Sequence, residues 1–200
     1  RGADAGFVGY DTIEIETQVT AIRRLGGDRI AILLRESPFY AESGGQISDF
    51  GEIVGDGWRV EVDDVKKIDG RPAAVVTLEG DFQFGRVSAR VPDDRRRDTE
   101  RNHTATHLLH SALRTVLGEG VHQAGSLVAP DRLRFDFTHH GPVKPERLEE
   151  VEEIVNREIW KGVPVTFTEM PFQEARAAGA MALFGEKYGD VVRVVNIPGF

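Results

Sequence analysis

The stretch Trp58-Arg59-Val60-Glu61-Val62 alternates strictly between apolar and charged residues. Because successive side chains of a β-strand point to opposite faces, this pattern predicts a strand with one buried face. Four more short strands are predicted around it, over residues 12–21, 29–34, 73–78 and 85–91. Turns separate the predicted strands at Gly26-Gly27, Gly55-Asp56-Gly57 and Asp69-Gly70. Short strands with tight turns indicate a small barrel or a sandwich over residues 1–92.

Residues 93–200 show a different periodicity. From about Asp98 to Leu117 the apolar residues follow helical spacing, and Gly118 ends the predicted helix. A second helix is predicted from Pro145 to Trp160 and a short one over 171–182. Strands are predicted over 125–128, 132–137, 163–168 and 191–197. The mixture predicts an α+β domain in which helices cover an antiparallel sheet.

Composition restricts the function classes. The formal charge of −8 argues against a protein that coats nucleic acid through bulk electrostatics, although a local basic path stays open. The run Asp93-Asp94-Arg95-Arg96-Arg97-Asp98 favours a solvated loop and helix start, with contact to RNA phosphates as the alternative. The absence of cysteine excludes disulfides, thiolate zinc ligands and cysteine nucleophiles within this chain. No apolar run approaches the roughly 18 residues of a membrane span. A first residue Arg1, rather than Met, predicts a fragment or a processed product.

The word His103-Thr104-Ala105-Thr106-His107 lies within the first predicted helix. Two imidazoles four residues apart project from the same side of a helix, as two ligands of a tetrahedral zinc ion require. A zinc protease helix carries Glu directly after the first His, and here Thr104 occupies that position. The pair therefore predicts a metal site but no protease, against the alternative of two ordinary polar residues. His110 continues the histidine stripe along the helix edge.

A second polar constellation runs from Ser37 to Asp49 and contains Glu42-Ser43-Gly44-Gly45-Gln46. Two adjacent glycines allow the backbone to approach a ligand closely, and the flanking residues offer a carboxylate, a hydroxyl and an amide. The segment Gln123-Ala124-Gly125-Ser126 is a similar polar turn. Local signals alone slightly favour a tight turn between strands over a binding site for each segment.

Several short sequence motifs, taken together and in this order, resemble those of one protein family. F-Y-A-E-S-G-G-Q at 39–46, R-N-H-T-A-T-H-L-L-H at 101–110 and Q-A-G-S-L-V at 123–128 resemble the post-transfer editing region of alanyl-tRNA synthetases. So do R-L-R-F-D-F at 132–137 and G-A-M-A-L-F-G-E-K-Y-G-D at 179–190, while F-V-G-Y-D at 7–11 resembles the lead into that region. The resemblance implies a small β-barrel followed by an α+β editing domain.

The resemblance also implies an activity and a partner. Such a region hydrolyses the ester of tRNA(Ala) mischarged with serine or glycine, in the cytoplasm, and the parent enzyme attaches alanine to tRNA(Ala). ATP and magnesium serve only the aminoacylation half, which is not part of this sequence. Since a pocket for alanine excludes glycine and serine only weakly, a second hydrolytic site is needed.

Matched residue by residue, the resemblance assigns His103 and His107 to a zinc ion. It places Gln46 beside the aminoacyl group, with Gly44 and Gly45 shaping the catalytic pocket. Four further residues are assigned to substrate binding: Glu42, Ser43, Gln123 and Ser126. The family's other metal ligands belong to a C-x-x-x-H word shortly after the 179–190 segment, and this sequence stops at Phe200 before it. We therefore expect a truncated chain whose metal is absent or incompletely coordinated.

Two alternatives remain from the sequence. One is a free-standing editing protein that acts in trans, against which the F-V-G-Y-D lead and the missing start Met argue. The other is a module that presents tRNA without catalysing hydrolysis, which the missing cysteine favours.

Overall fold

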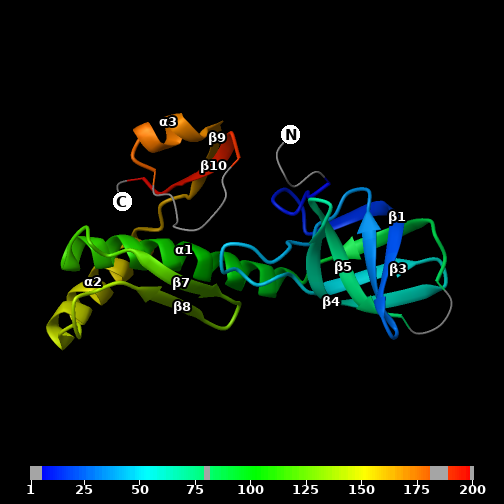
Figure 1. Cartoon of the computed structure of the whole chain (residues 1–200), viewed down its shortest axis with the longest axis horizontal. Helices are drawn as coiled ribbons and strands as arrows, with labels where there is room; N and C mark the ends of the chain where they lie inside the picture. The colour runs from blue at the N-terminus through cyan, green and yellow to red at the C-terminus, as the bar shows by residue number, and fades with distance from the viewer. Residues whose placement is uncertain (1–5, 79–81, 181–188, 199–200) are drawn as a thin grey trace. The chain divides into compact units, whose positions relative to one another are not determined.

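The computed structural model describes residues 6–78, 82–180 and 189–198. The chain divides into two compact units, Arg1–Thr99 and Glu100–Phe200, each described here by itself (Figure 1). Residues 181–188 of the G-A-M-A-L-F-G-E-K-Y-G-D word lie outside the described residues, as do 181–182 of the predicted short helix. Among the described residues, no helix has both the length and the apolar character that crossing a membrane requires.

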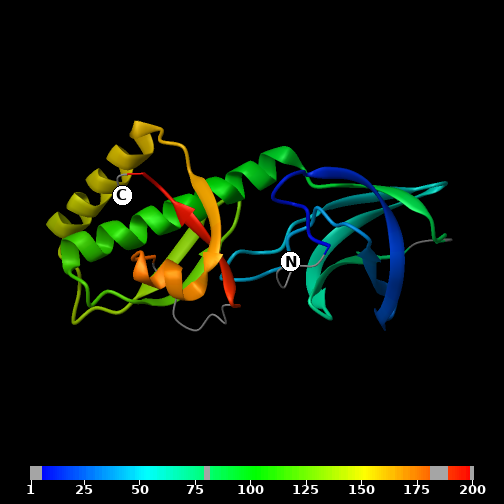
Figure 2. The same cartoon turned by 90° about the horizontal axis from the view of Figure 1, so that it is seen from above.

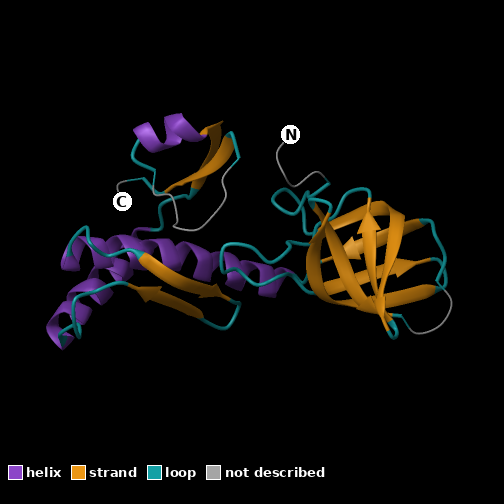
Figure 3. Ribbon diagram, in the orientation of Figure 1, coloured by secondary structure: helices purple, strands orange, loops and turns teal. Residues whose placement is uncertain are grey.

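The first unit contains a closed antiparallel barrel, which confirms the predicted barrel (Figure 3). Its strand order is β1-β2-β5-β4-β3-β6. The bounds are β1 Glu14–Gly26, β2 Arg29–Leu34, β3 Gly51–Gly55, β4 Trp58–Ile68, β5 Arg71–Thr77 and β6 Arg86–Arg90. Strand β3 was not predicted. It is only five residues long and has glycine at both ends, so its intrinsic strand signal is weak.

The barrel interior follows the predicted alternation. Val60 and Val62 are buried while Arg59 and Glu61 are exposed. The loop after β2 also contributes to this core, since Phe39 has no exposed surface. Closure leaves no open sheet edge, so the inward-facing side chains form one continuous apolar cluster.

Helix α1, Asp93–Leu117, begins in the first unit and continues through the second. The predicted start near Asp98 was wrong by about one turn. Pro92 precedes the helix, and Asp93 and Asp94 occupy its first turn, where carboxylates stabilise the positive end of the helix dipole. The prediction that residues 93–98 form a solvated loop and helix start was also wrong in one respect. Arg96 is buried with 5% of its surface exposed.

In the second unit, α1 shares an apolar core with β8 Leu133–Phe137 and α2 Pro145–Lys161, and β7 Gln123–Val128 pairs with β8. Strands β7 and β8 form an antiparallel pair, and Phe135 and Phe137 join the core formed with Leu113 and Val151. Asn102 of α1 donates from Nδ2 to the carbonyl of Ala129 (2.7 Å) and so ties the β7–β8 loop to the helix. This arrangement of helices on antiparallel strands agrees with the predicted α+β class.

The remainder of the second unit contains β9 Thr166–Pro171, α3 Phe172–Ala177 and β10 Val191–Asn196. Strands β9 and β10 pair antiparallel along their full lengths (Figure 2). Strand β9 starts three residues later than predicted, and α3 ends before Gly179, which has a φ of 86°. Within the described residues, the antiparallel strands of this unit form two separate two-stranded sheets.

Candidate functional site

Helix α1 brings the rings of His103 and His107 together. Their centroids are 5.1 Å apart and the ring planes differ by 21°, so the imidazoles stack one helical turn apart. Both side chains are half-buried. Their nitrogens therefore lie on one side of the helix, as the spacing predicted.

Both histidines are held in the neutral form at pH 7. Burial, which disfavours the charged imidazolium, lowers the pKa of His107 from 6.5 to about 4, and repulsion between the protonated forms of His103 and His107 adds to this effect. Burial also lowers the pKa of His103, and the nearby Arg193 guanidinium contributes. The neutral imidazole is the form in which histidine binds metal cations, so the protonation state of these two side chains is compatible with a metal site.

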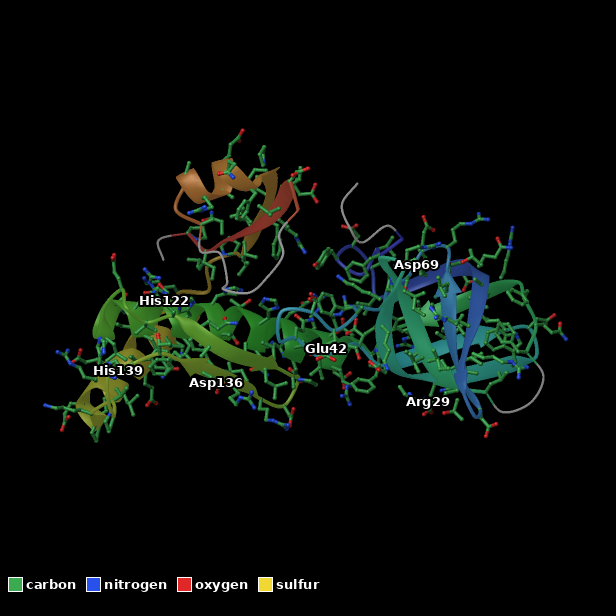
Figure 4. The ribbon with its side chains drawn as sticks, in the orientation of Figure 1. Arg29, Glu42, Asp69, His122, Asp136 and His139 are labelled. Carbon is green, nitrogen blue, oxygen red and sulfur yellow. The ribbon has the colours of Figure 1, made fainter. Side chains whose placement is uncertain are left out.

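The other four histidines are not part of this stacked pair. His110 is buried with 6% of its surface exposed, and its ring packs 4.9 Å from that of Phe135. His122 and His139, labelled in Figure 4, lie at the same end of the β7–β8 pair, and His122, His139 and His140 are all exposed. Within the part of the chain that the structure describes, no group of three or more His, Cys, Asp or Glu side chains could hold a metal ion.

The glycine pair of the first unit forms the tip of a tight hairpin. Ser43 and Gln46 exchange backbone hydrogen bonds of 3.2 and 3.0 Å, which leaves Gly44 and Gly45 as the two loop residues. Their φ angles are 60° and 82°, values that L side chains rarely adopt and that a two-residue hairpin of this type requires. Gln46 is buried, whereas Glu42 and Ser43 are exposed. The hairpin therefore buries the side-chain amide of Gln46 and exposes the side chains of Glu42 and Ser43.

A buried ion pair that sequence reasoning missed holds this loop. Arg96 donates to both carboxylate oxygens of Asp49, at 2.5 and 3.4 Å. It also donates to the carbonyl of Pro38 (2.8 Å) and to that of Gly9. Asp49 accepts a further bond from the Tyr40 amide at 2.7 Å. One guanidinium therefore fastens both ends of the 38–49 loop and the 7–11 lead together.

The signal for this ion pair was present in the sequence but could not be assigned. Asp49 closes the polar segment, and Arg96 lies at the centre of the basic run. An arginine in a run of charged residues is ordinarily solvated, and only the fold reveals that its partner is 47 residues away.

Gln123 and Ser126 lie on β7. Gln123 pairs in register with Phe137, and Ser126 with Phe135. Because cross-strand partners share a face, both polar side chains lie on the side of the hairpin that packs against α1. The second unit thus holds four of the predicted site residues: His103, His107, Gln123 and Ser126. The first unit holds the other five: Glu42, Ser43, Gly44, Gly45 and Gln46.

Comparison with known proteins gives a class first. Residues 3–96, which span the barrel and the 38–49 loop, match a family model described as tRNA synthetases class II (A). The matched segment ends at Arg96, the residue that closes the loop.

Similarity to individual proteins narrows this class, because the relatives compared are alanine–tRNA ligases. The chain is 54% identical over its full length to the enzyme of Thermus thermophilus. Over 97% of the chain, identity is 51% to the enzyme of Geobacillus thermodenitrificans and 48% to that of Staphylococcus aureus. The chain spans about a quarter of the length of these relatives, 24% for the first and 23% for the others.

Proposed function

We propose that this chain is the post-transfer editing region of an alanyl-tRNA synthetase, which hydrolyses the ester of serine or glycine on tRNA(Ala) in the cytoplasm. The parent protein would attach alanine to tRNA(Ala) with ATP. The observation that carries the proposal is the stacked pair of neutral histidines on α1. Support comes from the similarity of the full chain to a segment that makes up about one quarter of an alanine–tRNA ligase.

The donor set fits a zinc ion in part. His103 and His107 supply two neutral nitrogen ligands from one helix face, a common arrangement in zinc sites. A catalytic zinc ion has at least three protein ligands, so we propose that a further ligand comes from outside the described residues. Bound there, zinc would supply a Lewis acid for water or for the substrate's amino acid.

The other residues have binding and orienting roles in this proposal. Gln46 offers its amide to the aminoacyl group, and the bonds from Arg96 keep the loop that carries Gln46 in one position. Gly44 and Gly45 shape the pocket. Gln123 and Ser126 contact the substrate from β7 with an amide and a hydroxyl, on the side of the hairpin that faces α1.

Deacylation of labelled Ser-tRNA(Ala) tests the proposal. We expect a longer parent protein to release serine, and its double variant His103→Ala/His107→Ala to lose most of this activity while retaining its circular dichroism spectrum. Hydrolysis at the same rate by the double variant would refute the role of the histidines. Gln46→His should impair hydrolysis of Ser-tRNA(Ala) in the same protein, and an unchanged rate would refute the role of Gln46.

A second candidate function is a module that presents tRNA without hydrolysing the ester. The observation that favours it is the lack of a third metal-binding side chain near the pair within the described residues. Binding of tRNA(Ala) together with no release of serine, by either the chain or the longer parent, would support presentation over editing.

A further inference from the structure

Arg193 is a charged residue near the histidine pair to which the proposed function gives no role. It lies on β10, the strand drawn in red in Figure 1. Burial and then the positive charge of Arg193 lower the pKa of His103, so the guanidinium lies near this imidazole. Arginine keeps its proton at any physiological pH. The second unit therefore holds a permanent cation next to the two candidate metal ligands.

The guanidinium of Arg193 lies over an aromatic ring. Its central carbon is 3.8 Å from the centroid of the Phe167 ring on β9. Phe167 pairs in register with Val195, and Arg193 with Glu169, so these four side chains share one face of the two-stranded sheet. Contact with the ring limits the positions that this long side chain can adopt, and so it preorganises the N–H groups of the guanidinium.

The surroundings of Arg193 make its charge effective. Its side chain is half-buried, whereas Glu169, the acid directly opposite on β9, is exposed. Water screens the exposed carboxylate more than the half-buried guanidinium, so the positive charge dominates here. Phe167 and Val195 beside it are 52% and 41% exposed. In the described part of the chain, this face therefore presents a cation on an apolar surface that is open to a ligand.

Hydrolysis of an ester creates a negative charge that such a cation can stabilise. As the oxygen of water bonds to the ester carbon, one electron pair of the carbonyl double bond moves onto the carbonyl oxygen and forms an oxyanion. The pair then returns, the bond to the ribose oxygen breaks, and that oxygen takes the proton that the water loses. Because the carbonyl oxygen is charged only during the reaction, a fixed cation beside it stabilises the transition state more than the substrate.

We propose that Arg193 is a catalytic residue whose guanidinium donates hydrogen bonds to this oxyanion, in an ester held beside His103 and His107. The alternative is that Arg193 binds a phosphate of the terminal nucleotide, which would hold the substrate equally before and during the reaction. The nearness of Arg193 to the two candidate ligands favours the oxyanion role, because the reacting carbonyl would lie there. The inference rests on the proposed function.

Deacylation of Ser-tRNA(Ala) by the longer parent protein tests the proposal. Arg193→Gln should lower kcat about 100-fold and leave KM within about twofold, because the lost interaction exists only in the transition state. Arg193→Lys keeps the charge without the planar group and should lose about tenfold in kcat. Arg176→Gln is the matched control. It removes an exposed arginine of α3 in the same unit and should change kcat less than about twofold.

Binding measurements on the same variants give a second readout that needs no turnover. A phosphonate analogue of seryl-adenosine has a tetrahedral anion in place of the ester carbonyl, and an amide analogue has a planar, uncharged group there. Neither analogue contains a nucleotide phosphate. Arg193→Gln should weaken binding of the phosphonate roughly 100-fold and leave binding of the amide within about twofold, which also shows that the variant is folded.

Several outcomes would overturn the oxyanion role. They are a higher KM with unchanged kcat, equal effects on the two analogues, and equal losses in Arg193→Gln and Arg176→Gln. The unsubstituted parent protein separates the inference from the proposed function. If it releases no serine, both fail, whereas full activity that survives in Arg193→Gln overturns the inference alone.

Discussion

The two units of this chain are built in contrasting ways. In the barrel each strand pairs on both sides, and a cluster of fifteen buried apolar residues fills its interior. In the described part of the second unit, the corresponding cluster has four buried members and the strands form two-stranded sheets. Two-stranded sheets are marginal by themselves. The barrel is therefore expected to hold its loop rigidly, whereas the second unit depends on helix packing to position the histidine pair.

The largest effect is expected from the ion pair that fastens the loop. Asp49→Ala leaves the Arg96 guanidinium buried with 5% exposure and without its anion, which costs about 3–5 kcal/mol of unfolding free energy. Urea denaturation measures this loss. Asp49→Leu/Arg96→Met removes both charges and should recover much of it. Equal destabilisation in the single and double variants would show that the charge pairing is unimportant.

The contrast between the cores can be tested with one truncation in each. Ile53→Ala and Leu113→Ala both remove a nearly fully buried side chain, and each should cost about 2–5 kcal/mol. By hydrogen-exchange mass spectrometry, Ile53→Ala should accelerate exchange in the barrel strands, and Leu113→Ala in the second half of α1 with β7 and β8. The conservative Ile53→Val should cost only about 0.5–1.5 kcal/mol. Acceleration throughout the chain by either alanine variant would show that the units unfold together.

The smallest effect concerns pH and the histidine pair. The pKa of His107 is 6.5 when unfolded and about 4 when folded, so the unfolded chain takes up the proton first as pH falls. Stability should be unaffected by this group above pH 6.5 and should decline between pH 6.5 and 4, by at most about 3 kcal/mol. Urea midpoints across this range should fall less steeply in His107→Asn. The exposed His139→Asn serves as the control, and parallel profiles for the chain and His107→Asn would contradict the expectation.

Local patterns in the sequence predicted much of the fold. Strands such as β2 and β4 were found because alternation and branched side chains act within a few residues. Strand β3 escaped because Gly51 and Gly55 dilute its signal, and pairing with β4 and β6 determines its conformation. The start of α1 was displaced because the acidic and basic residues at 93–97 resemble a solvated loop until their partners are known.

The candidate site likewise contains features that the local sequence predicts and features that only the fold reveals. The side-by-side position of His103 and His107 follows from helical geometry alone. The anchoring of the 38–49 loop required the fold, since Arg96 binds groups 47, 58 and 87 residues earlier in the chain.

The Arg96 guanidinium has a consequence for the order of assembly. During synthesis the N-terminal part of a chain emerges first, so Gly9, Pro38 and Asp49 leave the ribosome well before residue 96. Until then the 7–11 lead and the 38–49 loop lack their common donor. Because α1 begins at Asp93, its first turn must be in place before the guanidinium can reach all three acceptors. The 38–49 loop therefore reaches its final structure only after the last barrel strand and the start of α1 have formed. A nascent chain that ends before α1 would lack the hydrogen bonds that Arg96 donates to this loop.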